Sequence, residues 1–370
     1  MNASQLNIEG AVTERYSQAS QEAEAALCCP VDYDARWLEV LPAELIDRDY
    51  GCGDPSQWVQ QGDHVLDLGS GGGKICYIAS QVVGADGSVT GVDMNEDMLA
   101  LARKYQSEIC GKIGWDNITF HKGKIQDLKL DMQEFEKWLQ DNPAADSQSW
   151  LQAEQQAEKL RLTRPMIADN SIDVVVSNCV LNLVNPNDRL QLFTELFRVL
   201  KPGGRAVISD IVSNQPVPAA MQNDATLWSG CISGAFEDQT FIQAFVDAGL
   251  GKVEILSRQS EPWQVVEGIE FRSMTLRAWK PLGIKDETGA GESAIYRGPW
   301  QKVVDDHGNA LVRGERVKIT RGQMREYEHP PYGADLILLD DEGKFMASDQ
   351  SPNASDLPIT DSCSPGSDCC

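Results

Sequence analysis

The fold is decided by the stretch Val65-Leu66-Asp67-Leu68-Gly69-Ser70-Gly71-Gly72-Gly73-Lys74. Its apolar part predicts a buried strand over residues 64–68, and its glycines predict a loop that opens a helix over residues 75–83. Glycines let the backbone come close to a ligand, and the start of a helix presents free N–H groups to it. The stretch therefore predicts a cofactor-binding loop, although the same glycines could form a plain tight turn.

An acidic residue follows at the place where such a loop holds a ribose. Asp93 ends the next predicted strand, residues 88–93, and lies 24 residues beyond Gly69. Its carboxylate can accept hydrogen bonds from two ribose hydroxyls. A dinucleotide would prefer the spacing G-x-G-x-x-G, but Lys74 stands at the last of these places. This departure counts against a dinucleotide.

The motif Asp-Leu-Gly-Ser-Gly, with an acid after the second strand, resembles that of class I S-adenosylmethionine (SAM) methyltransferases. The resemblance implies that SAM binds with its methionine part near Gly69 and Gly71 and its ribose on Asp93. It also implies further cofactor residues, namely Asp67 and Ser70 in the motif and Met94, Lys124 and Ile125 around the adenine. The Lys-Pro-Gly-Gly break at residues 201–204 is similar to one found in the same superfamily.

Strands and helices alternate along the chain on both sides of this loop. Further strands are expected over residues 118–121, 172–176, 205–210, 252–257 and 270–279, and further helices over residues 95–105, 188–200 and 238–248. Strands separated by helices indicate a mostly parallel sheet covered on both faces. The fold class is therefore α/β, with a Rossmann-like sheet.

Changes in composition and in hydrophobic pattern along the chain predict the domain organisation. A helical segment over residues 1–62 is expected to precede the cofactor-binding domain, residues 63–282, which carries a polar insertion over residues 127–169 with helices at 132–140 and 149–160. Short alternating segments indicate a small β-rich domain over residues 283–347. The Ser, Pro and Asp-rich end, residues 348–370, is expected to be disordered.

Charge and composition exclude several functions. The chain of 370 residues carries a formal net charge of −24, which argues against nucleic acid and against anionic membrane surfaces as partners. Neither a signal peptide nor a membrane-spanning apolar run is visible, so we expect a cytoplasmic monomer. Its ten cysteines should then be reduced. They lack doubled C-x-x-C spacing, so no structural zinc site is expected.

Three cysteines stand where a cofactor-binding domain should present its substrate. Cys179 follows the strand at 172–176, Cys231 lies in a segment rich in small residues, and Cys52 lies between two glycines. Thiolates select soft electrophiles and metalloids over harder species. A single cysteine in a sheet is more often a small buried hydrophobe, and we favour that interpretation for Cys76 and Cys110.

Five phrases occur in the same order as in the arsenite SAM methyltransferases, which the chain resembles over roughly residues 10–370. They are Tyr50-Gly51-Cys52-Gly53, Cys76-Tyr77, Gly91-Val92-Asp93-Met94, Ser177-Asn178-Cys179-Val180-Leu181-Asn182-Leu183 and Leu227-Trp228-Ser229-Gly230-Cys231. The resemblance implies methylation of arsenite for detoxification, with trivalent arsenic held by Cys179 and Cys231 and, as third ligand, by Cys52. It further implies a thiol–disulfide relay between Cys52 and Cys28 or Cys29, maintained by glutathione or thioredoxin.

The chain departs from the family at two places. The glycine loop of the family is typically followed by Arg-Asp-Cys-Tyr, whereas residues 74–77 read Lys-Ile-Cys-Tyr, and the stretch 127–169 is longer than usual. For two residues the sequence leaves a functional and a structural interpretation open. Asn178 could close the cofactor pocket or cap a turn, and Trp228 could line the substrate site or pack in the core.

Other functions remain open from the sequence. The acceptor could be another soft element, such as selenium or tellurium, or a small metabolite. A protein that binds metalloid through its thiols without turnover is a third hypothesis, which the intact glycine loop and Asp93 oppose. The tail cysteines, Cys363, Cys369 and Cys370, could deliver metalloid or be adventitious thiols.

Overall fold

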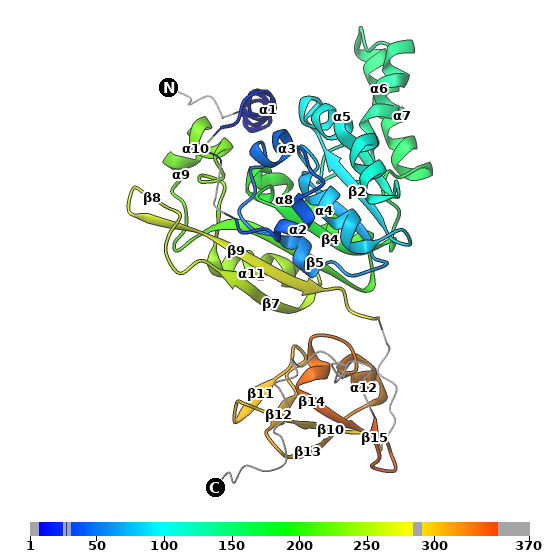
Figure 1. Cartoon of the computed structure of the whole chain (residues 1–370), viewed down its shortest axis with the longest axis vertical. Helices are drawn as coiled ribbons and strands as arrows, with labels where there is room; N and C mark the ends of the chain where they lie inside the picture. The colour runs from blue at the N-terminus through cyan, green and yellow to red at the C-terminus, as the bar shows by residue number, and fades with distance from the viewer. Residues whose placement is uncertain (1–6, 25–26, 28–30, 284–290, 347–370) are drawn as a thin grey trace, which may run out of the picture. The chain divides into compact units, whose positions relative to one another are not determined.

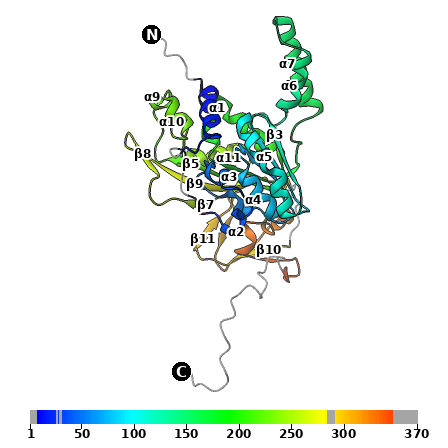
Figure 2. The same ribbon diagram turned by 45° about the horizontal axis from the view of Figure 1, so that its top comes forward.

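The computed structural model describes residues 7–24, 27, 31–283 and 291–346. It divides the chain into two compact units, Met1–Pro281 and Leu282–Cys370. Each unit has its own sheet and its own core (Figures 1 and 2). None of the helices in the described ranges has the length and apolar composition to span a bilayer.

A twisted, mostly parallel sheet forms the centre of the first unit. Its strands lie in the order β3 (Ile118–Lys122), β2 (Ser88–Asp93), β1 (His64–Leu68), β4 (Ile172–Asn178), β5 (Leu200–Ser213), β9 (Ile269–Trp279) and β7 (Gly251–Arg258). The first five are parallel, and β9 runs antiparallel to both β5 and β7. Two short strands, β6 (Phe236–Glu237) and β8 (Gln264–Val266), pair with β5 and β9.

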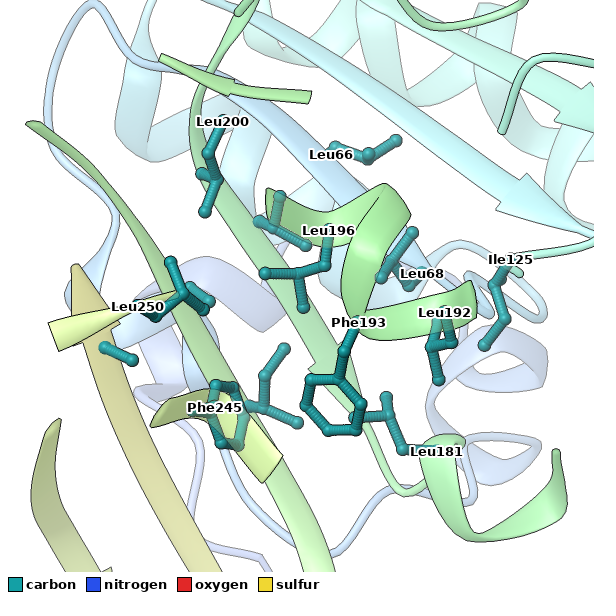
Figure 3. Packing of buried hydrophobic residues seen from close by; sticks show 14 of the residues in the cluster. Leu66, Leu68, Ile125, Leu181, Leu192, Phe193, Leu196, Leu200, Phe245 and Leu250 are labelled. Atoms are coloured by element: carbon teal, nitrogen blue, oxygen red, sulfur yellow. The ribbon is translucent and has the colours of Figure 1, made fainter. Parts of the chain in front are cut away.

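Helices cover both faces of this sheet because the strands are apolar on both sides. The helices are α4 (Lys74–Val83), α5 (Glu96–Ile113), α8 (Arg189–Val199) and α11 (Asp238–Asp247). Leu66 and Leu68 of β1 pack with Leu192 and Phe193 of α8 and with Phe245 of α11 (Figure 3). Burying each of these side chains contributes about 1.5–3 kcal/mol.

The other face packs against the helices that flank the glycine loop. Val65 of β1 and Val174 of β4 belong to a cluster with Ile78 of α4 and Leu99 of α5. Neighbouring strand residues such as Val65 and Leu66 thus serve opposite faces, as the alternation of side chains in a strand requires. The Rossmann-like α/β sheet expected from the sequence is confirmed.

Short helices before β1 and after β5 complete the first unit. They are α1 (Ile8–Ala19), α2 (Ala35–Leu38), α3 (Ala43–Asp47), α9 (Ala219–Gln222) and α10 (Ala225–Ser229), with the 3-10 turns η2 (Pro55–Trp58), η3 (Leu181–Leu183) and η4 (Pro186–Asp188). Although α1 and α10 are far apart in sequence, they pack against each other. The N-terminal segment therefore lies over the carboxyl end of the sheet (Figure 1).

The stretch between β3 and β4 forms a helical hairpin. Its helices are α6 (Met132–Asp141) and α7 (Ser147–Thr163), and they extend away from the sheet (Figures 1 and 2). Both helices fall where the sequence predicted them. Other elements differ in length from the prediction, since α5 continues to Ile113 and β5 already begins at Leu200.

The second unit is built on a small antiparallel sheet with β10 (Ser293–Tyr296) between β13 (Arg316–Lys318) and β14 (Leu336–Leu339). The edge strand β15 (Phe345–Met346) pairs with β14, and β11 (Lys302–Val304) forms a separate hairpin with β12 (Ala310–Val312). The remaining elements are α12 (Arg321–Tyr327) and the 3-10 turn η5 (Tyr332–Ala334).

Two features of the second unit were not foreseen. Residues 310–319 form two strands instead of one continuous alternating segment, because Gly314 adopts a left-handed φ of 79° and turns the chain. Helix α12 interrupts the β-rich texture and begins with a capping box, in which Thr320 and Gln323 satisfy each other's backbone N–H groups. The predicted disordered tail, residues 348–370, lies outside the described residues.

Candidate active site

The glycine loop turns back sharply at the carboxyl end of β1. Gly69 and Gly71 have positive φ values of 72° and 50°, and the Gly69 N–H donates to the carbonyl of Val92 over 2.8 Å. A Cβ at position 69 would lie 2.6 Å from Cγ2 of Val180, closer than real Cβ atoms approach. A Cβ at position 71 would meet nothing within 4 Å. The loop therefore requires glycine at 69 and leaves open space beside 71.

Asp93 lies next to this space with its carboxylate held by backbone groups. Its Oδ2 accepts the Gly71 N–H and its Oδ1 accepts the Asn95 N–H, both over 2.8 Å. Burial raises the pKa of Asp93, while these backbone donors lower it in part. Because carboxylate oxygens can accept more than one hydrogen bond each, Asp93 keeps acceptor capacity for the hydroxyls of a bound nucleoside.

The loop and Asp93 face one pocket that contains most of the predicted cofactor residues. The predicted residues that line it are Asp67, Gly69, Ser70, Gly71, Asp93, Met94, Ile125 and Asn178, and Cys179 lines it as well. Lys124 is not among the lining residues, because its Nζ pairs with Glu9 of α1 over 2.7 Å. Open space, glycine backbone and a ribose-type acceptor together fit a nucleoside cofactor such as SAM.

Helix α1 closes one side of the pocket, a role that was not predicted from the sequence. Glu9, Val12, Thr13 and Tyr16 all line the pocket. The helix is held by hydrogen bonds, for example from Asn95 Nδ2 to the Thr13 carbonyl over 3.1 Å. Val12 and Tyr16 were visible only as apolar positions at helical spacing, a pattern that core packing explains equally well.

Three cysteines predicted as substrate ligands converge beside the same pocket. Cys52, Cys179 and Cys231 are not in disulfide bonds, are buried and are members of one packing cluster. The Sγ of Cys231 donates to the carbonyl of Cys179 over 3.3 Å. The ligand atoms of Cys52, Cys179 and Asp210 all lie within 4.8 Å of one another. Segments about 130 residues apart in sequence, such as those of Cys52 and Cys179, thus bring their sulfur atoms together.

The thiols of Cys179 and Cys231 are held in their protonated form. A hydrogen bond with Cys179, together with burial, raises the pKa of Cys231 well above its usual value. The hydrogen bond from Cys231 lowers the pKa of Cys179, but the contact with Cys52 and burial outweigh it, so this pKa is also raised. Any ligand that binds these sulfur atoms as thiolates must therefore displace their protons.

Two of the three cysteines lie on strained backbone. Cys179 and Cys231 have φ values of 65° and 61°, in the left-handed region that residues other than glycine rarely adopt. The Cys179 N–H donates to the carbonyl of Ser209 over 2.8 Å, which helps to fix this conformation. Such strain costs about 1–3 kcal/mol per residue and is concentrated at functional sites. Cys179 thereby lines the pocket, and Cys231 lies beside Cys179.

Asn178 holds the loop that carries Cys52. Its Oδ1 accepts the backbone N–H groups of Cys52 and Gly53 over 2.9 and 3.1 Å, and its Nδ2 donates to the Gly53 carbonyl over 2.7 Å. The same Nδ2 donates to the hydroxyl of Tyr33 over 3.2 Å. Both interpretations from the sequence are therefore compatible with its place, since Asn178 lines the pocket and also caps a turn.

Comparison with known proteins agrees with this geometry. A family model described as a methyltransferase domain matches residues 60–165 and 153–249. An arsenite methyltransferase of Aquipseudomonas alcaligenes is 31% identical over 83% of this chain and 80% of its own length. The chain belongs to the arsenite methyltransferase family. The family member from Mus musculus is 30% identical over 81% of this chain and 73% of its own length.

A solved structure of the arsenite methyltransferase family also matches. It is the crystal structure of an arsenic(III) S-adenosylmethionine methyltransferase from Chlamydomonas reinhardtii, with a TM-score of 0.57 and 25% identity. The match covers 86% of this chain and 99% of that chain. Residues 285–367 match a further model, described as a domain of unknown function.

The structure explains how this arsenite methyltransferase accommodates its departure after the glycine loop. Ile75, at the place where the acidic residue was expected, is buried in the packing cluster of α4 and also lines the pocket. Lys74 is also buried, where its Nζ contacts Asp49 Oδ2 over 3.0 Å and lies 3.6 Å from the centre of the Tyr33 ring. The Tyr33 hydroxyl in turn donates to Asp49 over 3.0 Å. These contacts tie the glycine loop to the segment that leads to Cys52.

The remaining cysteines and Trp228 take different places. Cys76 is buried on α4 and its Sγ donates to Asp67 Oδ2 over 3.2 Å, while Cys110 packs on α5 with its Sγ 3.4 Å from Asp116. Trp228 is buried, and its indole N–H donates to the Leu183 carbonyl over 3.3 Å. Cys28, Cys29 and the three tail cysteines lie outside the described residues.

Proposed function

We propose that this enzyme transfers methyl groups from SAM to trivalent arsenic held by Cys52, Cys179 and Cys231. The observation that carries the proposal is the convergence of three buried thiols at a pocket that also contains the glycine loop and Asp93. Cys179 belongs to both parts, since it lines the pocket and contacts the other two sulfur atoms. Acceptor and donor are therefore expected to meet beside Cys179.

The residues of the pocket would bind and orient the donor. Asp93 would accept hydrogen bonds from ribose hydroxyls, and the open space at Gly71 would allow the backbone to approach the ligand. The side chains of α1 would cover the bound molecule and exclude water. When bound, SAM supplies an electrophilic methyl group on a sulfonium. Fixing both reactants in one pocket makes the transfer effectively unimolecular.

The thiols would prepare the acceptor without a separate general base. Arsenite carries three hydroxyl groups, and each bond that forms between arsenic and a cysteine sulfur releases one molecule of water that carries the thiol proton. Protonated cysteines are therefore the correct starting state for loading. Arsenic bound to three thiolates keeps one lone pair, which is the nucleophile for the methyl carbon.

We also propose how the site is kept active. None of the five cysteines in the described part of the chain is in a disulfide bond, which fits a reducing compartment such as the cytoplasm. Methyl transfer uses the arsenic lone pair and leaves arsenic formally pentavalent. Cys52 and Cys28 or Cys29 would return it to the trivalent state by giving up two electrons and forming a disulfide, which glutathione or thioredoxin would then reduce after each cycle. Measuring turnover with either reductant, and then with Cys28→Ser and Cys29→Ser separately, would identify the partner thiol.

Methylated products provide the direct test. The protein is incubated with SAM, arsenite and thiol, and the products are separated by chromatography with element-specific detection. Cys179→Ser should abolish methylated arsenicals, whereas Cys110→Ser, the same substitution at a buried cysteine of α5, should retain them. Equal product from both variants, or none from the wild-type enzyme, would overturn the proposal.

A further inference from the structure

A carboxylate completes a ligand set with two of the three thiols. Asp210, near the carboxyl end of β5, lies with Cys52 and Cys179 so that one ligand atom of each is within 4.8 Å of the other two. Their relative exposures are 0%, 3% and 6%, so all three are shielded from solvent. The set combines two sulfur atoms with one oxygen atom.

The charge of Asp210 is not matched by a direct ion pair. Its oxygen atoms accept the backbone N–H groups of Ile211 and Asn182 over 2.8 and 3.2 Å. Among the described residues, no Lys or Arg is in salt-bridge distance, and the nearby Arg189 donates instead to backbone carbonyls such as that of Gly234. Burial raises the pKa of Asp210 to about 7. A cation bound beside Asp210 would compensate its buried charge.

Arsenic does not account for this carboxylate, because trivalent arsenic selects sulfur. Two cysteines and one carboxylate match a different ion, Zn²⁺, which binds Cys, His and Asp or Glu in tetrahedral sites. With zinc–sulfur distances of about 2.3 Å, two sulfur ligands in a tetrahedron lie about 3.8 Å apart. The distances between the ligand atoms of Cys52, Cys179 and Asp210, which are at most 4.8 Å, need to shorten by no more than about 1 Å to reach that arrangement.

We propose that Cys52, Cys179 and Asp210 form a binding site for Zn²⁺ that competes with arsenite. Binding releases two thiol protons to solvent, and Cys179 links the ion site to the pocket, because it also lines that pocket. Cys231 lies outside the set, because its ligand atom does not fall within the same 4.8 Å group. Zinc and arsenic thus share two thiols, but Asp210 serves zinc alone and Cys231 serves arsenic alone. The cysteine spacing differs from that of a structural zinc site.

A pair of variants separates the two ions. Zn²⁺ is titrated into the reduced full-length protein, without arsenite or SAM, in competition with a chromophoric chelator. Asp210→Asn should weaken the zinc site at least tenfold and leave arsenite binding within a factor of about three. Cys231→Ser should have the opposite effect, with zinc retained and arsenite weakened. Other thiols of the chain are present in both variants, so their zinc binding cancels in the comparison.

Cobalt provides a second readout that does not depend on the folding of the Asp210 variant. Co²⁺ bound to the wild-type protein should show sulfur-to-cobalt charge-transfer absorption, which Cys52→Ser halves and Cys231→Ser leaves unchanged. Zn²⁺ should also inhibit methylation competitively with arsenite and not with SAM. Equal zinc affinity in wild-type and Asp210→Asn, or loss of the cobalt band in Cys231→Ser, would overturn the proposal. Methylation in zinc-free buffer tests the proposed function separately.

Discussion

Replacing Gly51 by alanine is expected to release Cys52 from its place at the site. A Cβ at position 51 would lie 2.5 Å from Cγ and 2.8 Å from Oδ1 of Asn178, so the amide would have to move. That amide makes the hydrogen bonds to Cys52, Gly53 and Tyr33 that hold the loop. The substitution therefore acts on Cys52 through its neighbour, without changing any thiol.

The expected loss of stability follows from these four hydrogen bonds. Each contributes about 0.5–1.5 kcal/mol net, and some of the released backbone groups will find water instead. We expect the free energy of unfolding to fall by about 2–4 kcal/mol. Because Gly69, Gly71 and Asp93 of the pocket lining are not touched by the substitution, SAM affinity should change less than arsenite methylation does.

Three measurements on Gly51→Ala check this reasoning. Denaturant unfolding gives the stability, isotope-coded alkylation gives the reactivity of Cys52, and product analysis gives the rate of methylation. Gly111→Ala is the matched control, since a Cβ there meets nothing within 4 Å on helix α5, and it should be neutral or stabilising by up to about 1 kcal/mol. Unchanged stability and unchanged Cys52 reactivity in Gly51→Ala would refute the account.

Three further outcomes are expected. Tyr33→Phe removes the hydroxyl that donates to Asp49 and to the Gly53 carbonyl, so it should lower kcat and leave SAM affinity unchanged. Tyr77→Phe is the control, since it loses a buried hydrogen bond to a carbonyl of α5 and should lower stability alone. Equal kcat values in the two variants would contradict the role of Tyr33. Glu9→Gln should weaken SAM binding less than about fivefold, and less still at high salt, because the ion pair with Lys124 is partly exposed; calorimetric titration at two ionic strengths checks this. Burial raises the pKa of Asp67 from 3.8 to about 7, so the stability contribution of its protonated form is complete below pH 4 and is lost as the pH rises towards 7. Relative to Asp67→Asn, the free energy of unfolding of the wild type should fall by on the order of 4 kcal/mol between pH 4 and pH 7. If the free energies of unfolding of the two proteins depend on pH in the same way, the raised pKa of Asp67 is contradicted.

The sequence was sufficient for the sheet and for the cofactor loop because both depend on local patterns. Gly69 and Gly71 are needed for a sharp turn, and Asp93 supplies a hydrogen-bond acceptor at the end of a strand, so each can be explained from its own neighbourhood in the sequence. Apolar strands separated by helices predict covered parallel sheets wherever they occur. The resemblance then supplied the cysteines, which periodicity alone treats as small hydrophobes.

Contacts between distant segments could not be predicted in the same way. The place of α1 over the pocket depends on partners such as Asn95, and the hold of Asn178 on Cys52 joins segments more than a hundred residues apart. Asp210 lies in an apolar strand, where the sequence offers no reason to pair it with Cys179. Lys124 was expected at the adenine, whereas in the structure it pairs with Glu9 of α1. No local sequence pattern determines the position of that helix.

X-ray absorption at the arsenic edge tests the central claim most directly, since it counts the atoms bound to arsenic in the protein. With one equivalent of arsenite bound to the reduced wild-type protein, three sulfur neighbours are expected. Single replacements of Cys52, Cys179 and Cys231 by serine should each leave two sulfur atoms and one oxygen, and Cys110→Ser should leave all three sulfur atoms. A wild-type spectrum with fewer than three sulfur neighbours, or one that none of the three replacements changes, would contradict the site described above.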